Sequence, residues 1–408
     1  MTQYTKRERG MSLVEVMIAI TIGAVLTTGT VQMFVANSET QSLMMGQSRM
    51  QESARFAFDF IGRSIQRAGY RGCYSSTADM HDTFDNDDFL PYEFNLKNGI
   101  QGFEGVGVDL WSPNFIPPLA ILTGNNVPLT DAAGDDTSVY YQTLIASAQS
   151  DLEAAGKGAG TGIPFESLID NTDIITLRYM RQDDVESRLV QRLIGDDPIS
   201  VYNQPDDTSP VEDHHMAVIH DCAQATIFKI TDVSDGAAGQ TDIEHDAVTT
   251  PTDDVFPIRN DIETLDLRGA FETDAAVAGI ESDTYFIAPG TGQNDQGNTP
   301  LSLWRKSGLF GPVELVEGVE DLQIRYGESL DDTDTPNRYV LAFQVGDWKD
   351  VKTVRVTIVV NSVDDVGATS TPTHTCDVQT CYEGEPSDGI DGLARRSYTQ
   401  TFKLRNSS

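Results

Sequence analysis

The residue with the clearest potential for chemistry is Glu15, the only charged residue between Met11 and Ala36. A carboxylate in so apolar a stretch is unfavourable by several kcal/mol unless a partner neutralises it, so such residues are normally functional. If the chain is cut between Gly10 and Met11, the new α-amine lies four residues before Glu15. On a helix, that amine can pair with its own Glu15 or with the Glu15 of an adjacent subunit. The alternative is a single-span anchor with a polar residue tolerated near the lipid headgroups.

The stretch that carries Glu15 is long enough to be a membrane-spanning helix. Residues 11–36 would extend about 39 Å as an α-helix, against about 30 Å for a hydrocarbon core. Basic residues precede the stretch. Basic residues before a membrane-spanning helix favour a cytoplasmic N-terminus, so the rest of the chain is expected on the other side of the membrane. A secretory signal peptide is cut after its apolar region, whereas the Gly10-Met11 boundary lies before it. We therefore expect residues 1–10 to be a leader and residues 11–36 to remain as a transmembrane and assembly helix.

A more polar, amphipathic half of the same helix is predicted over residues 37–70. Its apolar residues recur at steps of three and four, the spacing of one buried helix face; they are Met50, Ala54, Ala57, Ile61, Ile65 and Ala68. Gly69 follows, as expected just beyond a helix end, so the helix should run from about Met11 to Ala68. Phe56 and Phe60 flank the apolar face. We expect them to extend the core, the alternative being that they anchor a partner subunit.

The remainder, residues 71–408, is predicted to be a β-rich head with long acidic loops, which gives an α+β fold with the long helix packed on an antiparallel sheet. Alternating or apolar runs predict strands at Ile175–Tyr179, Ala223–Thr231, Tyr285–Ala288, Leu301–Lys306, Val319–Tyr326, Tyr339–Gln344, Val354–Val360 and Tyr398–Leu404. Segments rich in Asp, Gly, Thr and Ser predict surface loops at 75–90, 124–138, 150–163, 232–256 and 289–299. Because strands recur on both sides of these loops, one elaborated head is expected rather than two independent domains.

Four cysteines lie in the predicted head. Outside the inner membrane they should oxidise, and four cysteines allow three pairings. We expect Cys73–Cys222, which would fasten the helix end to a strand, and Cys376–Cys381, which would close a small loop. The alternative is a zinc site built from all four thiolates with His374. The sequence lacks the paired Cys-x₂-Cys spacing that is typical of such a site.

The sequence gives little support for catalysis or for a cofactor. It contains no Gly-x-Ser-x-Gly, no Gly-Lys-Ser/Thr phosphate loop and no His-Glu-x-x-His. The run from Gly156 to Gly160 is predicted to be a flexible loop. The histidines at 214, 215 and 220, and the carboxylates at 331, 332 and 334, are weak candidates for metal and Ca²⁺ sites respectively; solvated surface positions are the favoured interpretation of both groups. We therefore expect no enzyme, no cofactor and no bound metal.

The charge balance excludes one broad class of partner. The 63 acidic residues outnumber the 28 basic ones, which gives a formal charge of −35 and an isoelectric point near 4.2. Proteins that coat nucleic acids need a basic face to displace phosphate counterions, so no direct nucleic-acid partner is expected.

Several segments resemble a known family. The run from Arg9 to Met17, Arg-Gly-Met-Ser-Leu-Val-Glu-Val-Met, resembles the class III signal of type IV pilins and type II secretion pseudopilins. Later segments resemble PilW-type minor pilins; they are Arg67–Cys73, Asp221-Cys222, Gly318–Gly327, Asp347–Val356 and Phe402–Asn406. The resemblance implies that a prepilin peptidase cuts between Gly10 and Met11, that Met11 is then N-methylated, and that Glu15 neutralises the amine of a neighbouring subunit.

The same resemblance implies a role and a location. A PilW-type minor pilin would wait as a single-pass protein in the inner membrane, then join a type IV pilus initiation or tip complex that supports motility and adhesion. Its partners would be other minor pilins, the major pilin, the inner-membrane assembly machinery and a large tip adhesin where one is present. The alternatives are a type II secretion pseudopilin, or a tip adhesin whose acidic loops bind a ligand directly.

Overall fold

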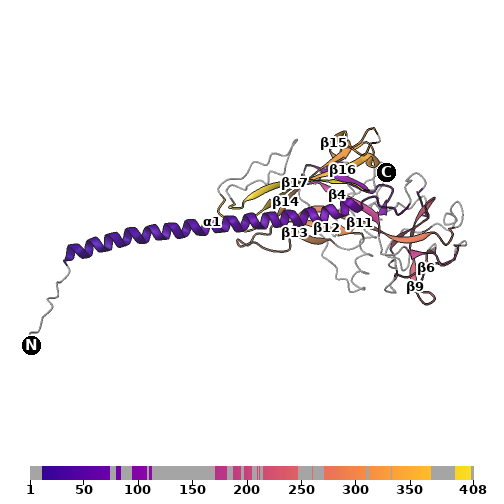
Figure 1. Ribbon diagram of the computed structural model, residues 1–408, viewed down its shortest axis with the longest axis horizontal. Helices are drawn as coiled ribbons and strands as arrows, with labels where there is room; N and C mark the ends of the chain where they lie inside the picture. The colour runs from indigo at the N-terminus through magenta and orange to yellow at the C-terminus, as the bar shows by residue number, and fades with distance from the viewer. Residues whose placement is uncertain are drawn as a thin grey trace, which may run out of the picture.

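The chain forms one long helix that runs along a β-rich head and projects far beyond it (Figure 1). The computed structural model describes residues 12–73, 80–83, 94–107, 110–112, 171–181, 187–193, 197–204, 209, 211, 215–246, 260, 271–308, 312–331, 333–368 and 391–405. The helix, α1, spans Leu13–Arg67, close to the predicted bounds. It ends because Gly69 adopts a φ of 73°, a conformation that reverses the chain and that glycine tolerates best. The Gly69 N–H then donates to the carbonyl of Arg178 at 2.8 Å, which fixes the helix end to the head.

The largest sheet has ten strands arranged around one long strand, β11 (Ala276–Pro289). Its main path runs β1-β8-β7-β11-β4-β2-β3. These strands are β1 (Met80–Asp82), β2 (Ile100–Gly107), β3 (Leu110–Ser112), β4 (Ile174–Met180), β7 (Met216–His220) and β8 (Ala225–Lys229). The off-path strands are β5 (Ser187–Arg188), β12 (Leu301–Ser307) and β13 (Val313–Glu317). The first part of β11 pairs with β5 and β7 and the later part with β4 and β12, so one strand joins two halves of the head.

A four-stranded antiparallel sheet lies beside α1, in the order β15-β14-β16-β17. Its strands are β14 (Val319–Glu328), β15 (Arg338–Val340), β16 (Val351–Asn361) and β17 (Arg395–Lys403). A smaller sheet of three strands, ordered β6-β10-β9, lies at the end of the head farthest from the projecting helix (Figure 1). It consists of β6 (Ile199–Tyr202), β9 (Asp232–Asp235) and β10 (Gln240–Glu244).

The main core forms where α1 meets the two larger sheets. All six residues of the predicted apolar helix face are buried there. They pack with residues of the ten-stranded sheet, including Ile175, Leu177, Tyr285, Ile287 and Leu303, and with residues of the four-stranded sheet, including Leu322, Ile324, Val354, Val356 and Ile358. Branched side chains on alternating positions suit such a half-buried pleated surface. The expected α+β arrangement, a long helix packed on an antiparallel sheet, is therefore confirmed.

Most predicted strands are present, and the errors fall in segments with weak alternation. The predicted loop 232–256 contains β9 and β10, and the predicted loop 75–90 contains β1. The predicted strand Tyr339–Gln344 stops at Val340 and continues as a 3-10 helix over Ala342–Gln344. Loop 289–299 is confirmed, whereas 124–138 and 150–163 lie outside the described residues. Six further strands were not predicted: β2, β3, β5, β6, β7 and β13.

Candidate functional site

The first half of α1 presents apolar side chains to the outside of the molecule. The exposed set includes Leu13, Val14, Met17, Ile18, Ile20, Ile22, Val25, Leu26, Val31, Met33, Phe34 and Val35. Among the described residues, α1 is the one helix long and apolar enough to cross a membrane, judged by length and composition. No residue of its most apolar window is buried against the head, whereas the core helix of a soluble protein would bury such a stretch. This half is therefore free to enter a bilayer or to pack against other helices.

Glu15 lies in the first turn of α1. Its carboxylate accepts a hydrogen bond from the backbone N–H of Ser12 at 3.0 Å. Unpaired N–H groups and the helix dipole both favour a negative charge at this end. Gly10 and Met11 lie outside the described residues, so cleavage and methylation there stay predictions.

The head first contacts α1 at Gly46, the most N-terminal buried residue of the helix. The turn that follows β16 lies against it. A Cβ added at Gly46 would stand 2.9 Å from Cγ1 of Val366 and 3.1 Å from Cβ of Ser362, so the missing side chain permits this close approach. One helical turn further on, Arg49 forms an ion pair with Asp364 of the same turn. The residues before Gly46 form the free part of the helix, and those after it form the docked part.

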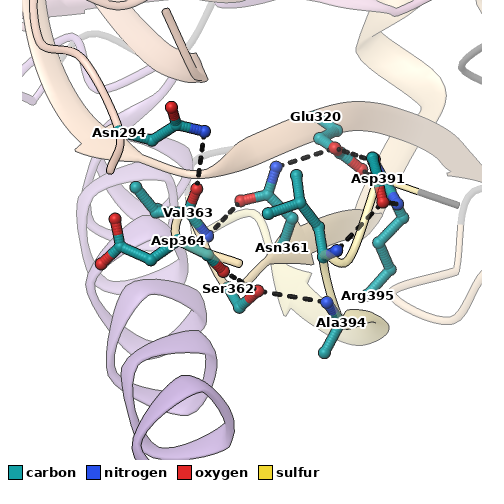
Figure 2. Close-up of polar contacts among 10 residues, drawn as sticks. Asn294, Glu320, Asn361, Ser362, Val363, Asp364, Asp391, Ala394 and Arg395 are labelled. Atoms are coloured by element: carbon teal, nitrogen blue, oxygen red, sulfur yellow. Dashed lines mark hydrogen bonds and ion pairs between the residues drawn. The ribbon is translucent and has the colours of Figure 1, made fainter. Parts of the chain in front are cut away.

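A polar network holds this turn in place, as Figure 2 shows. Arg395, the first residue of β17, donates to Glu320 through Nε at 2.7 Å and Nη2 at 2.9 Å, and it also pairs with Asp391. Asn361 donates to the same Glu320 at 2.7 Å and accepts from the N–H of Val363 at 2.8 Å. A guanidinium that meets a carboxylate through two nitrogens is a strong and directional pair. The network thus ties β14, β16 and β17 together at the point where the head contacts the helix.

The docked part of α1 packs closely on β17. A Cβ added at Gly62 would overlap Cε1 of Phe402, which is buried. Phe58 meets the same ring at a centroid distance of 6.2 Å. The two flanking phenylalanines behave differently: Phe60 is partly buried against the core, as expected, but Phe56 is 49% exposed, so the prediction that it extends the core was wrong. Phe58, which was not singled out from the sequence, takes that place.

One disulfide fastens the C-terminal end of α1 to the head. Cys73 and Cys222 are bonded with their Cα atoms 5.1 Å apart and 149 residues apart in sequence. Cys222 lies in the turn between β7 and β8, so the bond joins the helix end to the β7–β8 hairpin. A loop of this length corresponds to roughly 4–5 kcal/mol in an entropic description of disulfides. This predicted pair is confirmed, and the zinc alternative that needs both thiolates is wrong; Cys376 and Cys381 lie outside the described residues.

Two buried carboxyl groups meet where the ten-stranded and four-stranded sheets join. Asp173 accepts from the backbone N–H of Gly105 at 3.1 Å and from that of Ile324 at 2.6 Å. Burial raises the pKa of Asp173 well above its usual value, and the neighbouring Glu104 raises it further. Burial raises the pKa of Glu104 to about 7, partly opposed by Arg325 at 3.7 Å. These groups were not predicted from the sequence, because only the pairing of distant strands brings them together.

The weaker candidates do not form a catalytic or metal-binding arrangement among the described residues. No group of three or more His, Cys, Asp or Glu side chains there could hold a metal ion. Asp331 accepts hydrogen bonds from Ser329, Thr333 and Asn337, as a self-contained turn does. His214, Asp332 and the segment 156–160 lie outside the described residues.

Two family models match the chain, one near its N-terminus and one near its C-terminus. A model described as the prokaryotic N-terminal methylation motif covers residues 5–31, and one described as type IV pilus-assembly protein W covers residues 284–406. The first match and the exposed apolar helix define the chain as prepilin-like and indicate a membrane-anchored pilin. With the second match, the two models support a PilW-type prepilin-like protein related to the type IV pilus. No curated protein matches the chain.

The second match coincides with the part of the head that receives the helix. Residues 284–406 run from the second half of β11 to β17 and so include the whole four-stranded sheet. The strands β1 and β6 to β10 lie between the two matches in sequence. The matched residues therefore include the first part of α1 and the whole four-stranded sheet, whereas the docked part of α1 and the strands β1 to β10 lie between the two matches.

Proposed function

We propose that this protein is a minor pilin that joins a type IV pilus initiation or tip complex and supports pilus assembly. The observation that carries the proposal is the free half of α1. It exposes an apolar surface over residues 13–35, beyond a head that folds around the other half of the same helix. An element of this kind can be stored in a membrane and later transferred into a bundle of like helices, because both surroundings cover its apolar side chains.

In this proposal the domains are a leader at 1–10, a transmembrane and assembly helix at 11–36, an amphipathic continuation at 37–70 and a head at 71–408. A prepilin peptidase removes the leader after Gly10, and Met11 is N-methylated. The head waits in the periplasm while the helix stays in the inner membrane. The disulfide in the head supports an oxidising compartment on that side of the membrane.

Glu15 directs assembly in this proposal. Its carboxylate lies at the N-terminal end of an otherwise apolar helix, where it is unfavourable in lipid unless a positive group neutralises it. The α-amine created by cleavage on a neighbouring subunit supplies that charge. The partners are other minor pilins, the major pilin, the inner-membrane assembly machinery and, where one is present, a tip adhesin. The match to the PilW model favours a pilus over a secretion system.

The proposal is tested by mass spectrometry of the protein's N-terminus in sheared filaments. We expect a chain that starts at N-methylated Met11 in the filament fraction. Glu15→Val should still be cleaved and methylated, but it should be lost from filaments, because the valine cannot pair with a neighbour's amine. The matched control is Glu39→Val, which removes an exposed acid further along α1. A mature chain that begins beyond Ala36, or normal piliation in the Glu15→Val strain, would contradict the proposal.

A further inference from the structure

The last described strand of the head, β17, has an outer edge that pairs with no other described strand. It ends the four-stranded sheet and, among the described strands, pairs only with β16. The pairing continues over nine residues without a register shift. Edge strands that avoid other chains are usually short, bulged or interrupted by proline. β17 has nine residues, no register shift and no proline, and its charged side chains, Arg395, Arg396 and Lys403, lie at its two ends.

The hydrogen-bond pattern shows which backbone groups face outward. Leu404 donates to Lys352 and Ser362 donates to Ala394, each at 2.9 Å, so the even-numbered residues of this segment bond to the β16 side. In an antiparallel ladder the residues between them point the other way. The N–H and C=O groups of Ser397, Thr399 and Thr401 therefore point away from β16, in the arrangement that an added strand requires.

A groove of about 690 Å³ runs along the same edge, between β17 and the exposed flank of α1. Tyr398, Gln400 and Phe402 line it from the strand, and Arg55, Phe56 and Arg63 line it from the helix. The Tyr398 hydroxyl is shielded from solvent and has no hydrogen-bond partner among the described residues. A strand added to β17 would direct alternate side chains into this groove, against Phe56 and within reach of the tyrosine.

The groove is basic although the chain is strongly acidic. Arg55 is exposed and has no ion-pair partner in the described part of the chain. Arg63 pairs with Asp59, the one acid among the described residues that line the groove. The Arg396 guanidinium lies 5.5 Å from the centre of the Tyr398 ring. Positive side chains around a groove on a protein of charge −35 favour a segment that carries carboxylates.

A second copy of this chain does not suit the edge. An antiparallel β17–β17 pair centred on Thr399 would place Arg395 opposite Lys403, and directly opposed like charges destabilise a sheet. The net charge of each head adds a further repulsion.

We propose that β17 is a docking strand for the head of a different pilin subunit. An extended segment of that subunit adds to its free edge by backbone hydrogen bonding. The segment carries carboxylates that meet Arg55 and Arg396, and an apolar side chain that covers Phe56. This inference rests on the proposed function, since the partner is a neighbour in the assembled complex. It adds a contact between heads to the packing of helices.

The test is photo-cross-linking in cells that express the full chain, with p-benzoylphenylalanine in place of Thr401. The expected product joins β17 to a peptide from another protein that carries an N-terminal methylation motif. The matched control has the same photoreactive residue in place of Tyr339, on β15 at the opposite edge of the same sheet, and should not give this product. A cross-link to a second copy, to residues 369–390 of the same chain, or to no pilin at all would overturn the proposal.

Two pairs of variants test the mechanism. Thr399→Pro removes an outward N–H that makes no bond to β16, whereas Thr399→Val keeps it; we expect about a tenfold loss of the cross-link for the first only. Arg55→Glu should weaken the cross-link to a similar extent, while Arg192→Glu, an equal charge change at a remote exposed site, should not. Unchanged cross-linking in both Thr399→Pro and Arg55→Glu would overturn the proposal. Because Arg55 is exposed and has no ion-pair partner among the described residues, its variant tests the proposal even if the proline variant does not fold.

The wild-type protein separates this inference from the proposed function. Its absence from sheared filaments would contradict the proposed function itself. Its presence there, without a cross-link that depends on the β17 edge, would contradict strand addition alone.

Discussion

At the scale of single residues, Glu104 and Asp173 make the stability of the head depend on pH. Burial raises the pKa of Glu104 from 4.5 to about 7 and raises the pKa of Asp173 well above its usual value. A carboxyl group with a raised pKa in the folded state takes up a proton on folding. Its contribution to stability is therefore complete below the unfolded-state pKa and is lost as the pH rises through the folded-state value. We expect the free energy of unfolding to fall between pH 4.5 and pH 7.

Glu104→Gln tests this expectation, because glutamine keeps the shape of the protonated side chain and cannot ionise. The variant should match the wild type at pH 4 to 5 and exceed it by roughly 1–3 kcal/mol at pH 8. Urea unfolding followed by tryptophan fluorescence measures the difference. Glu272→Gln, which changes an acid whose side chain is 59% exposed, is the control. Parallel stability curves for the wild type and Glu104→Gln would rule out the buried carboxyl as the source of the pH dependence.

Residue-scale prediction from the sequence succeeds where the signal is local or where few alternatives exist. Glu15 stands out because its neighbours are apolar, and Cys73–Cys222 was one pairing among few. Gly46 lies four residues before Met50 on the same face of α1. Its burial was not predicted, because the expected buried face was defined by apolar side chains and glycine has none. Glu104 and Asp173 had no local signal. Their burial follows from the pairing of β2 with β4 and from the contact of β14 with that pair.

At the scale of elements, the fit between α1 and β17 depends on the absence of a side chain at Gly62. Its hypothetical Cβ overlaps the ring of Phe402. We expect Gly62→Ala to destabilise the head by about 1–2 kcal/mol, since the strain of overpacking exceeds the gain in helix propensity. Urea unfolding of the detergent-solubilised chain measures this through tryptophans that all lie in the head.

The control is the same Gly62→Ala substitution made in a protein that already carries Phe402→Ala. In Phe402→Ala the space above Gly62 is open, so Gly62→Ala should stabilise by about 0.5–1 kcal/mol through helix propensity alone. The sign of the effect should therefore reverse between the two backgrounds. The same sign in both would show that the helix does not rest on this ring.

Elements with strong periodicity were the ones that the sequence predicted well. The docked face of α1 and the strands β14 and β16 repeat apolar residues at helical or alternating spacing, and their segments were identified correctly. β9 reads Asp-Val-Ser-Asp and lies at a sheet edge with little buried, so its composition resembles that of a loop. Pairing with β10 makes it a strand, and such pairing is a tertiary effect that no local pattern reports.

At the scale of the whole molecule, the head and the free helix are built to act separately. The disulfide, the Arg395 network and the docked helix face all lie at or beyond Gly46. The apolar residues from Leu13 to Val35 bury nothing in the head. A head whose folding does not depend on the free helix can stay folded while that helix moves from lipid into a filament, as the proposed function requires. The net charge of −35 also makes separate copies of the chain repel one another.

Two truncations test this separation. A chain that begins at residue 37 removes only exposed parts of α1, so its melting temperature should stay within about 2 °C of the full-length protein in detergent. It should also be monomeric without detergent, because the exposed apolar stretch is gone. A chain that begins at residue 53 also loses Gly46, the Arg49–Asp364 ion pair and the buried Met50.

The shorter chain should melt at least about 5 °C lower, since it loses a buried side chain and the contact that holds the turn after β16. Differential scanning calorimetry of the three proteins measures both differences. If the chain that begins at residue 37 were also strongly destabilised, the head would depend on the free helix, and one element could not serve in turn as membrane anchor and filament contact without unfolding the rest. If both truncations kept the full-length melting temperature, the boundary between the free and the docked helix would lie beyond residue 53.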